Sequence, residues 1–244
     1  GATALAWAAA FARTTGRPLV LLHVDGASHD TRLVPESMRV VAETFAKRLD
    51  DRRAGHEASL AKNAANLDVQ CSLRIADGHP WEEMLSVAQE IDAALLVVGP
   101  HESGLGSTAR RVVTHADRPV FCARGVAPRT LESLRWVVGV PSQESHALVR
   151  HVRELVDVSE GKLALVRAVS AWPAVATVTG TPMSMPPVEE FRVAAHDHLE
   201  ALCTSLKLEC ERHAEIGAPE QVLDRVAGEG DIIAVAAHDR GPLE

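Results

Sequence analysis

The chain has 244 residues, of which 46% are hydrophobic, and a formal net charge of −8. This acidic balance argues against general nucleic-acid binding, which depends on clustered Lys and Arg. With no Tyr, four Phe and four Trp, the chain also lacks the aromatic side chains of a base-stacking surface. No apolar run approaches the roughly 20 residues that span a bilayer, and the apolar residues near the start follow helical spacing rather than a signal-peptide pattern. We therefore expect a cytoplasmic protein that binds neither nucleic acid nor membrane.

Helices and apolar strands alternate along the first half of the chain. The expected elements are helix 2–15, strand 19–24, helix 35–65, strand 69–75, helix 80–91, strand 94–98, helix 106–116 and strand 119–123. In the long helix, Met38, Val41, Phe45 and Leu49 form an apolar stripe. Continuously apolar strands between helices are typical of parallel strands that are buried on both faces.

The same alternation begins again after a linker. The expected elements are strand 135–140, helix 144–158, strand 163–168, loop 172–187, helix 188–206, strand 207–213, helix 219–227 and strand 232–236. The predicted fold class is therefore α/β, with two tandem doubly wound units whose sheets are mainly parallel. The first unit is expected over residues 1–124, the linker over 125–134 and the second unit over 135–244.

The two halves are similar in sequence. Segment 68–80 aligns with segment 207–219 without a gap, and segment 97–104 aligns with segment 234–241. The matched pairs include Cys71 with Cys210, Gly78 with Gly217 and Pro80 with Pro219. A shared Gly-x-Pro has a physical reason, because glycine permits the turn and proline fits the first position of a helix. This similarity predicts an internal duplication.

These features resemble a tandem universal stress protein. The resemblance rests on the order of elements, the strand Val137-Val138-Gly139-Val140, the Gly-x-Pro helix starts and the glycine loop that ends at Gly106-Ser107-Thr108. It implies two universal-stress-protein or adenine nucleotide alpha-hydrolase-like units, packed as an intramolecular pseudo-dimer, and a non-enzymatic role in the stress response. In that family the strand equivalent to 119–122 pairs two units, so a homodimer is a further option, and an unidentified protein partner is expected. Compared with the family pattern, the first unit lacks its opening strand and the second its last helix and strand, so we expect the sequence to be part of a longer chain.

The resemblance also assigns a nucleotide loop to the first unit. The family loop reads Gly-x2-Gly-x9-Gly-Ser/Thr, and a glycine loop before a helix N-terminus is suited to anions. The candidate binding residues are Gly99, His101, Gly104, Gly106, Ser107 and Thr108. However, Glu102 stands at the second glycine position, and only six residues separate Gly99 from Gly106, half as many as in the family pattern. Because a short loop with a carboxylate disfavours a triphosphate, we expect no cofactor, with ATP or ADP at the first unit as the alternative.

In the second unit the loop departs further from the family pattern. Ala236 and Asp239 replace the two glycines, and Pro141 stands where the family has a strand-end Asp. Both loops read His-acid-x-Gly, beginning at His101 and His238. Three interpretations follow: both loops have lost nucleotide binding, the His and acid pairs hold a cation or another small ligand, or the first loop still binds a mono- or diphosphate nucleotide.

Other polar groups carry weaker predictions. The segment His196-Asp197-His198 invites a metal interpretation, but on a helix only His196, Glu200 and Cys203 share a face, so we expect no metal site. The segment 77–80 is expected to serve as a turn and helix cap, and Arg110-Arg111 could face an anion. No paired nucleophile and base is found, and the four cysteines have no CxxC spacing, so we expect packed thiols and no catalytic residue.

Overall fold

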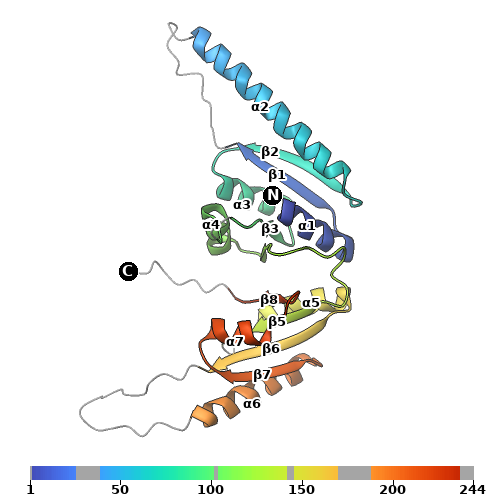
Figure 1. Ribbon diagram of the computed structural model, residues 1–244, viewed down its shortest axis with the longest axis vertical. Helices are drawn as coiled ribbons and strands as arrows, with labels where there is room; N and C mark the ends of the chain where they lie inside the picture. Colours follow the sequence, from blue (N-terminus) through green and yellow to red (C-terminus); the bar gives the residue numbers. More distant parts are fainter. Residues whose placement is uncertain (1, 26–38, 102–103, 142–145, 170–187, 237–244) are drawn as a thin grey trace, which may run out of the picture. The chain divides into compact units, whose positions relative to one another are not determined.

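The computed structural model in Figure 1 describes residues 2–25, 39–101, 104–141, 146–169 and 188–236. It forms two compact units, Gly1–Thr130 and Leu131–Glu244. The division falls inside segment 125–134. Within the described ranges, no helix is both long and apolar enough to cross a membrane.

The first unit alternates four helices and four strands along its described residues. They are α1 (Ala2–Thr15), β1 (Leu19–Asp25), α2 (Arg39–Ala65), β2 (Cys71–Asp77), α3 (Pro80–Glu90), β3 (Leu96–Val98), α4 (Ser107–His115) and β4 (Val120–Cys122). Strands β1 and β2 pair in parallel from Leu19 beside Cys71 to Asp25 beside Asp77. Strands β3 and β4 form a second parallel pair. The α/β fold with parallel strands is therefore confirmed, but in the described residues these strands form two separate pairs.

Helix α1 is deeply buried in the first unit. All six residues from Trp7 to Ala12 are buried, and the helix contacts both β1 and β3. A run of six consecutive buried residues means that α1 is covered all round rather than along one stripe. The rings of Trp7 and Phe11 each lie 4.9 Å from the ring of Phe121 on β4, and Trp7 Nε1 donates to the carbonyl of Arg124 at 2.8 Å. These contacts fasten the helix to β4.

In its described residues, the second unit contains one four-stranded parallel sheet. Its elements are β5 (Arg135–Gly139), α5 (His146–Ser159), β6 (Lys162–Val169), α6 (Val188–Leu206), β7 (Glu211–Ile216), α7 (Pro219–Val226) and β8 (Ile232–Ala234). The strand order is β7-β6-β5-β8. Val137, Ala164 and Val166 point to one face of the sheet, where they pack against Val222 of α7. Because successive strand residues alternate between faces, the buried Leu165 points to the other face, so both faces are covered.

The Gly-x-Pro turns have the same geometry in the two units. Gly78 and Gly217 have φ values of 146° and 152°, a region that side chains rarely adopt. The N–H of Gly78 donates to the carbonyl of Asp25, and the N–H of Gly217 donates to the carbonyl of Val169, each at 3.0 Å. A proline then opens α3 and α7 at the first helical turn. The repeated sequence therefore makes the same turn at the end of equivalent strands.

Strand β7 begins later than the sequence pattern predicts. The prediction placed it at 207–213, whereas it spans Glu211–Ile216. Lys207 has a left-handed φ of 51°, and the N–H of Leu208 donates to the carbonyl of Cys203 at 2.9 Å. These residues complete the C-terminal cap of α6 and cannot join the sheet. The side chains of the predicted stripe at 38, 41, 45 and 49 lie outside the described residues.

Candidate functional site

The predicted binding loop joins β3 to α4 at the carboxyl end of the strand. Gly99 follows directly after β3, and Gly106 is the N-cap of α4, with φ of −64° and ψ of 166°. Ser107 and Thr108 form the start of the helix, whose first turn carries no acidic side chain. The unpaired N–H groups of a first helical turn, together with the helix dipole, attract anions. This position is therefore suited to one anionic group.

The loop closes on itself before it reaches the helix. The N–H of His101 donates to the carbonyl of Gly104 at 2.9 Å, and the N–H of Gly104 donates to the carbonyl of His101 at 3.1 Å. Gly104 adopts a φ of 117°, which a residue with a side chain rarely takes. Both N–H groups are thus used inside the loop and are not available to a ligand.

The side chain of His101 lies against the start of α4. A Cβ atom placed on Gly106 would lie 3.3 Å from the Cβ and 3.5 Å from the Cδ2 of His101. The loop therefore brings together three of the predicted residues, His101, Gly104 and Gly106, and Ser107 and Thr108 follow in the helix. Arg124 also approaches this loop, since its guanidinium would lie 3.7 Å from a Cβ on Gly104.

The sequence profile of the Universal stress protein family matches residues 1–124, half of the chain. The chain belongs to this family. No curated protein matches the sequence.

Among solved structures, the fold is similar to that of a universal stress protein from Archaeoglobus fulgidus DSM 4304. The TM-score is 0.60 at 13% identity, over 91% of this chain and 76% of that chain. It is also similar to a functionally unknown protein from Pseudomonas aeruginosa PAO1, with a TM-score of 0.57 at 11% identity over 95% of this chain and 75% of that chain. At these identities the similarity concerns the fold.

The structure describes only part of the two predicted nucleotide loops of this universal stress protein. Glu102 lies outside the described residues, as does the equivalent loop of the second unit from His238 to Gly241. Of the predicted basic pair on α4, Arg111 lies 5.6 Å from the ring centroid of Trp81 on α3. This cation–π contact holds the Arg111 side chain against α3.

The polar segment 77–80 makes the predicted turn, but its side chains do not cap the helix. His79 is the N-cap of α3 and makes no side-chain cap hydrogen bond. The carboxylate of Asp77 instead accepts a hydrogen bond from Arg53 on α2 at 3.1 Å. Asp77 therefore links β2 to α2, which a local sequence pattern could not indicate.

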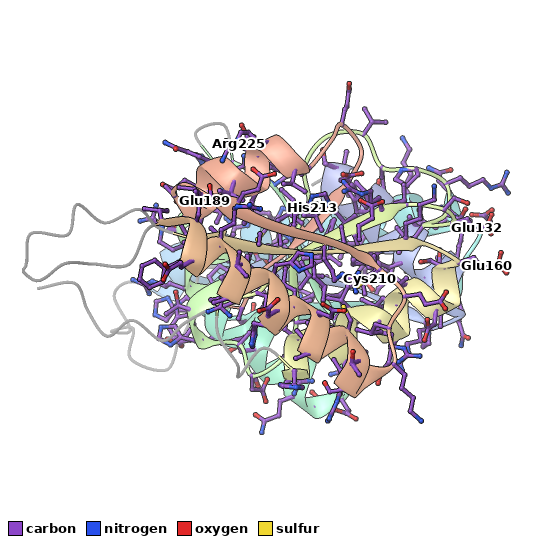
Figure 2. The ribbon with its side chains drawn as sticks, turned by 90° about the horizontal axis from the view of Figure 1, so that it is seen from below. Glu132, Glu160, Glu189, Cys210, His213 and Arg225 are labelled. Carbon is purple, nitrogen blue, oxygen red and sulfur yellow. The ribbon has the colours of Figure 1, made fainter. Side chains whose placement is uncertain are left out.

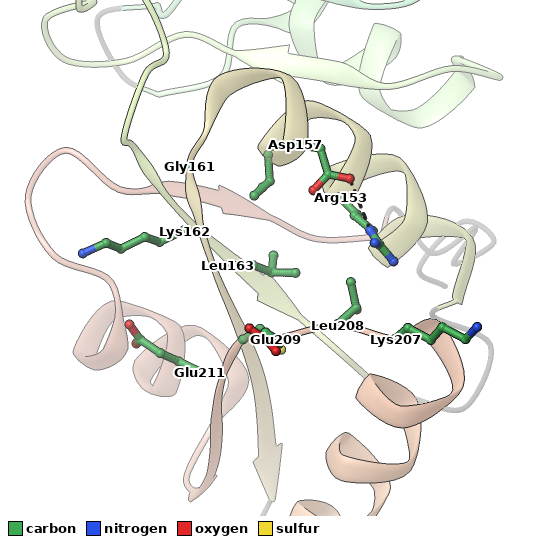
Figure 3. Close-up of a pocket in the computed structure, with 11 residues that line it drawn as sticks. Arg153, Asp157, Gly161, Lys162, Leu163, Lys207, Leu208, Glu209 and Glu211 are labelled. Atoms are coloured by element: carbon green, nitrogen blue, oxygen red, sulfur yellow. Dashed lines mark hydrogen bonds and ion pairs between the residues drawn. The ribbon is translucent and has the colours of Figure 1, made fainter.

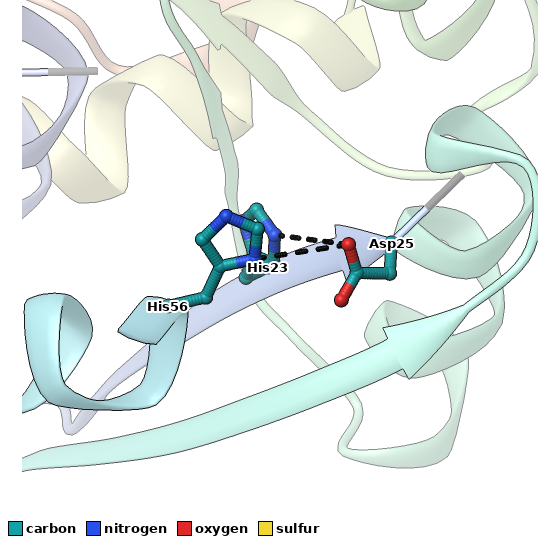
Figure 4. A group of neighbouring side chains, drawn as sticks. All are labelled: His23, Asp25 and His56. Atoms are coloured by element: carbon teal, nitrogen blue, oxygen red, sulfur yellow. Dashed lines mark ion pairs between the residues drawn. The ribbon is translucent and has the colours of Figure 1, made fainter. Parts of the chain in front are cut away.

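Three side chains of the first unit meet at the carboxyl end of β1, and our sequence analysis missed them. They are His23 and Asp25 of β1 and His56 of α2, and their possible ligand atoms all lie within 4.8 Å of one another (Figure 4). The His-x-Asp spacing at the end of a predicted strand was a usable signal, because residues two apart on a strand share a face. His56 lies on a helix 31 positions after Asp25, so only the folded structure brings it close.

In α6 the structure gathers a different set from the predicted one. His196, Asp197 and Glu200 have ligand atoms within 4.8 Å of one another and are all exposed. Cys203, which was expected to share their face, is buried, and its Sγ lies 3.1 Å from the Sγ of Cys210. Cys210 comes directly before β7, and His213 lies on that strand (Figure 2).

The second unit has a cleft of about 570 Å³ at the amino ends of β6 and β7 (Figure 3). Its charged lining residues are Arg153, Asp157, Lys162, Lys207, Glu209 and Glu211. Arg153 pairs with Asp157 at 3.3 Å and donates to the carbonyl of Leu206 at 2.6 Å. Because ligands of doubly wound proteins bind at the carboxyl ends of the strands, and because these charges balance, the cleft does not match a nucleotide site.

Proposed function

We propose that this universal stress protein acts in the stress response without catalysis, by binding a protein partner or a small ligand, and that its nucleotide loops no longer hold ATP. We further propose that the second unit is a diverged copy of the first. The equivalent hydrogen bonds of Gly78 and Gly217 at the ends of β1 and β6 support this duplication.

The closure of the loop between Gly99 and Gly106 is the observation that carries the proposal. A loop that binds a triphosphate must present several N–H groups along the phosphate chain. Here the N–H groups of His101 and Gly104 are bonded within the loop, and His101 lies against the helix start. The first turn of α4 still offers N–H groups to an anion, and it suits one phosphate group better than three.

Charge supports the same proposal. Glu102 stands at the second glycine position of the family pattern, and Asp239 stands at the equivalent position of the second unit. Two like charges 4 Å apart repel by about 1 kcal/mol in water and by more where the site is shielded. A carboxylate in each loop therefore opposes a polyphosphate ligand.

The alternative function is an ATP- or ADP-binding regulator that uses Gly106, Ser107 and Thr108. The acid-free first turn of α4 and the nearby guanidinium of Arg124 favour this alternative. Such a protein would hold the terminal phosphate at the helix start, with no enclosing loop.

Calorimetric titration of the protein with ATP, ADP and AMP separates the two functions. We expect no nucleotide to bind with a Kd below about 1 mM, which corresponds to a binding free energy of about −4 kcal/mol. A Kd below about 10 μM for ATP or ADP would overturn the proposal. In that event, Ser107→Ala should weaken binding and Glu102→Gly should strengthen it, and an exposed change in the second unit, Ser205→Ala, serves as the matched control.

We also propose that the free edge of β4 pairs two units, as the resemblance implies, either within the chain or in a homodimer. Among the described strands, β4 pairs with β3 alone, so one edge keeps its unpaired N–H and C=O groups. The molar mass from light scattering during size exclusion reports a homodimer directly. A mass equal to one chain at about 100 μM protein would exclude the homodimer as a stable species.

A further inference from the structure

The group formed by His23, Asp25 and His56 occupies the face of β1 that α2 covers. His23 and Asp25 are two residues apart, so both side chains leave the strand on the same face. Among the α2 side chains that the structure describes, the half-buried ones are His56, Leu60 and Ala64, four residues apart, and they form the stripe that faces the strands. The side chain of Asp25 is 13% exposed, and those of His23 and His56 are 33% and 35% exposed.

The nitrogen atoms that point toward Asp25 have no hydrogen bond. Nε2 of His23 and Nδ1 of His56 are both inaccessible to solvent and unbonded. They lie 3.8 Å and 3.7 Å from the same oxygen, Oδ1 of Asp25, beyond hydrogen-bond distance (Figure 4). A buried polar atom without a hydrogen-bond partner is unfavourable, so two of them around one carboxylate point to a common partner.

The distances match the spacing of ligands around a metal ion. Zinc takes His nitrogen and carboxylate oxygen at about 2.0–2.1 Å in a tetrahedral arrangement, which places two ligand atoms about 3.4 Å apart. The two distances to Asp25 Oδ1 exceed this value by only a few tenths of an ångström. The two imidazole rings have centroids 4.0 Å apart and are tilted by 55°, so neither stacks flat on the other.

We propose that His23, Asp25 and His56 bind one divalent transition-metal cation of the zinc type. Two imidazoles and one carboxylate are a ligand set that zinc uses with a fourth position left for water or a ligand. The ion would accept the lone pairs of both unbonded nitrogens and would neutralise the carboxylate. The proposal does not depend on the nucleotide loop and would stand if the loop bound ATP.

The second unit shows what these positions hold when no ligand set is present. The alignment of β1 with β6 places Arg167 at the position of His23 and Val169 at that of Asp25. The repeat offset places the buried Ala195 at the position of His56. Ordinary packing of a helix on this strand therefore needs none of the three polar side chains, so a role in folding does not explain them.

Two arginines of α2 pair with the carboxylates at the ends of β1 and β2. Arg52 Nη2 lies 3.5 Å from Asp25 Oδ1, and Arg53 pairs with Asp77, the neighbour of Asp25 across the strand pair. The side chain of Arg52 is 50% exposed and carries four rotatable bonds, so it can turn into solvent when an ion enters. Arg52 therefore competes with the metal for the carboxylate, which gives the proposal a distinctive consequence.

The test uses the full chain without an affinity tag, freed of metal with EDTA and then dialysed against Zn²⁺. The bound zinc is counted by atomic emission, and four-coordinate Co²⁺ provides a visible absorption spectrum as a second readout. We expect one Zn²⁺ per chain, and at least a tenfold weaker affinity for His56→Ala and for Asp25→Asn, at the scale typical of metal-site changes. His196→Ala, in the exposed cluster of α6, is the matched control and should change the affinity less than twofold.

The Arg52→Gln variant makes the test independent of folding defects. Removing the cation that competes with the ion for Asp25 should strengthen zinc binding by about threefold to tenfold, whereas a damaged fold would weaken it. Zinc that does not bind, or that binds equally well to His56→Ala and the intact protein, overturns the proposal. Unchanged affinity in Arg52→Gln also overturns it, because the ion would then not share Asp25 with this arginine.

Discussion

Replacement of Arg135 by Met should destabilise the amino-terminal end of the sheet in the second unit. Arg135 opens β5, and its guanidinium donates to Asp231 Oδ2 at 2.8 Å, to the carbonyl of Val226 at 3.0 Å and to Glu211 Oε2 at 2.6 Å. One side chain thus joins the start of β5 to the start of β7 and to the segment before β8. The methionine keeps most of the aliphatic bulk and removes all three hydrogen bonds.

The contributions of the three partners differ because their burial differs. The side chain of Asp231 is 13% exposed; it keeps a hydrogen bond from the N–H of Gly228 at 2.8 Å and loses the charged one from Arg135. A hydrogen bond to a charged group is worth about 1.5–3 kcal/mol. The side chain of Glu211 is 50% exposed, so its pair adds at most about 1 kcal/mol. We expect the free energy of unfolding of this unit to fall by about 3 kcal/mol.

The assay is urea denaturation followed by circular dichroism. With an m-value of about 2 kcal/mol/M, the midpoint for the second unit should fall by about 1.5 M. Hydrogen exchange of a peptide that covers β5 assigns the change to this unit. Arg212→Met, which removes an exposed arginine from β7, is the control and should shift the midpoint by less than about 0.3 M.

The pH dependence provides a second check on the same reasoning. The hydrogen bond from Arg135 holds the pKa of Glu211 below its usual value of 4.5. A lowered carboxyl pKa gives stability that is present above the unfolded value and is lost as the pH falls through the folded value. The difference between Arg135→Met and the intact protein should therefore shrink below about pH 4.5. A variant that is as stable as the intact protein at neutral pH, or a difference that grows in acid, would refute the ion-pair argument.

Three further predictions follow from the second unit. Gly217→Ala should lower the free energy of unfolding by about 1–3 kcal/mol in thermal denaturation, because φ is 152° and the new Cβ would lie 3.1 Å from Cγ2 of Val222; full stability would contradict the turn geometry. Val137→Ala should cost about 2 kcal/mol in urea denaturation, since the side chain is fully buried, and a loss below about 0.5 kcal/mol would contradict this packing. Burial and the hydrogen bond to Cys203 raise the pKa of Cys210 to about 12. Under reducing conditions at pH 8, the Cys210 thiol of the folded protein should therefore react with iodoacetamide far more slowly than the same thiol of the urea-unfolded chain. Because the unfolded chain loses this proton first, near its ordinary value of 9.0, the free energy of unfolding should fall as the pH rises above 9; a fall of the same size in Cys210→Ser would refute this origin.

The order of helices and strands could be predicted from the sequence because it depends on local patterns. Apolar runs bounded by turn residues gave β5 and β6 within two residues of their observed ends. The start of β7 could not be predicted, because Lys207 and Leu208 have apolar neighbours but serve to end α6. The capping geometry of a helix competes with strand pairing for the same residues, and hydrophobicity does not report which one prevails.

The candidate sites differ in how far the sequence could reveal them. The loop from Gly99 to Gly106 is contiguous, so its shortness was visible, but the bridge between His101 and Gly104 needed the backbone geometry. The group of His23, Asp25 and His56 depends on the docking of α2 on β1. Contacts between distant segments follow from tertiary packing and leave no local periodicity.

The shared turn after β1 and β6 has a consequence for how such a chain can change. Because Gly78 and Gly217 anchor through backbone atoms to Asp25 and Val169, the crossover keeps its shape whatever side chain ends the strand. One unit can thus carry a charged or metal-binding residue at the end of this strand, as at Asp25, while the other unit carries an aliphatic one, as at Val169. The two halves of the chain can therefore acquire different side chains, and with them different ligands, at this position while the backbone of the turn stays the same.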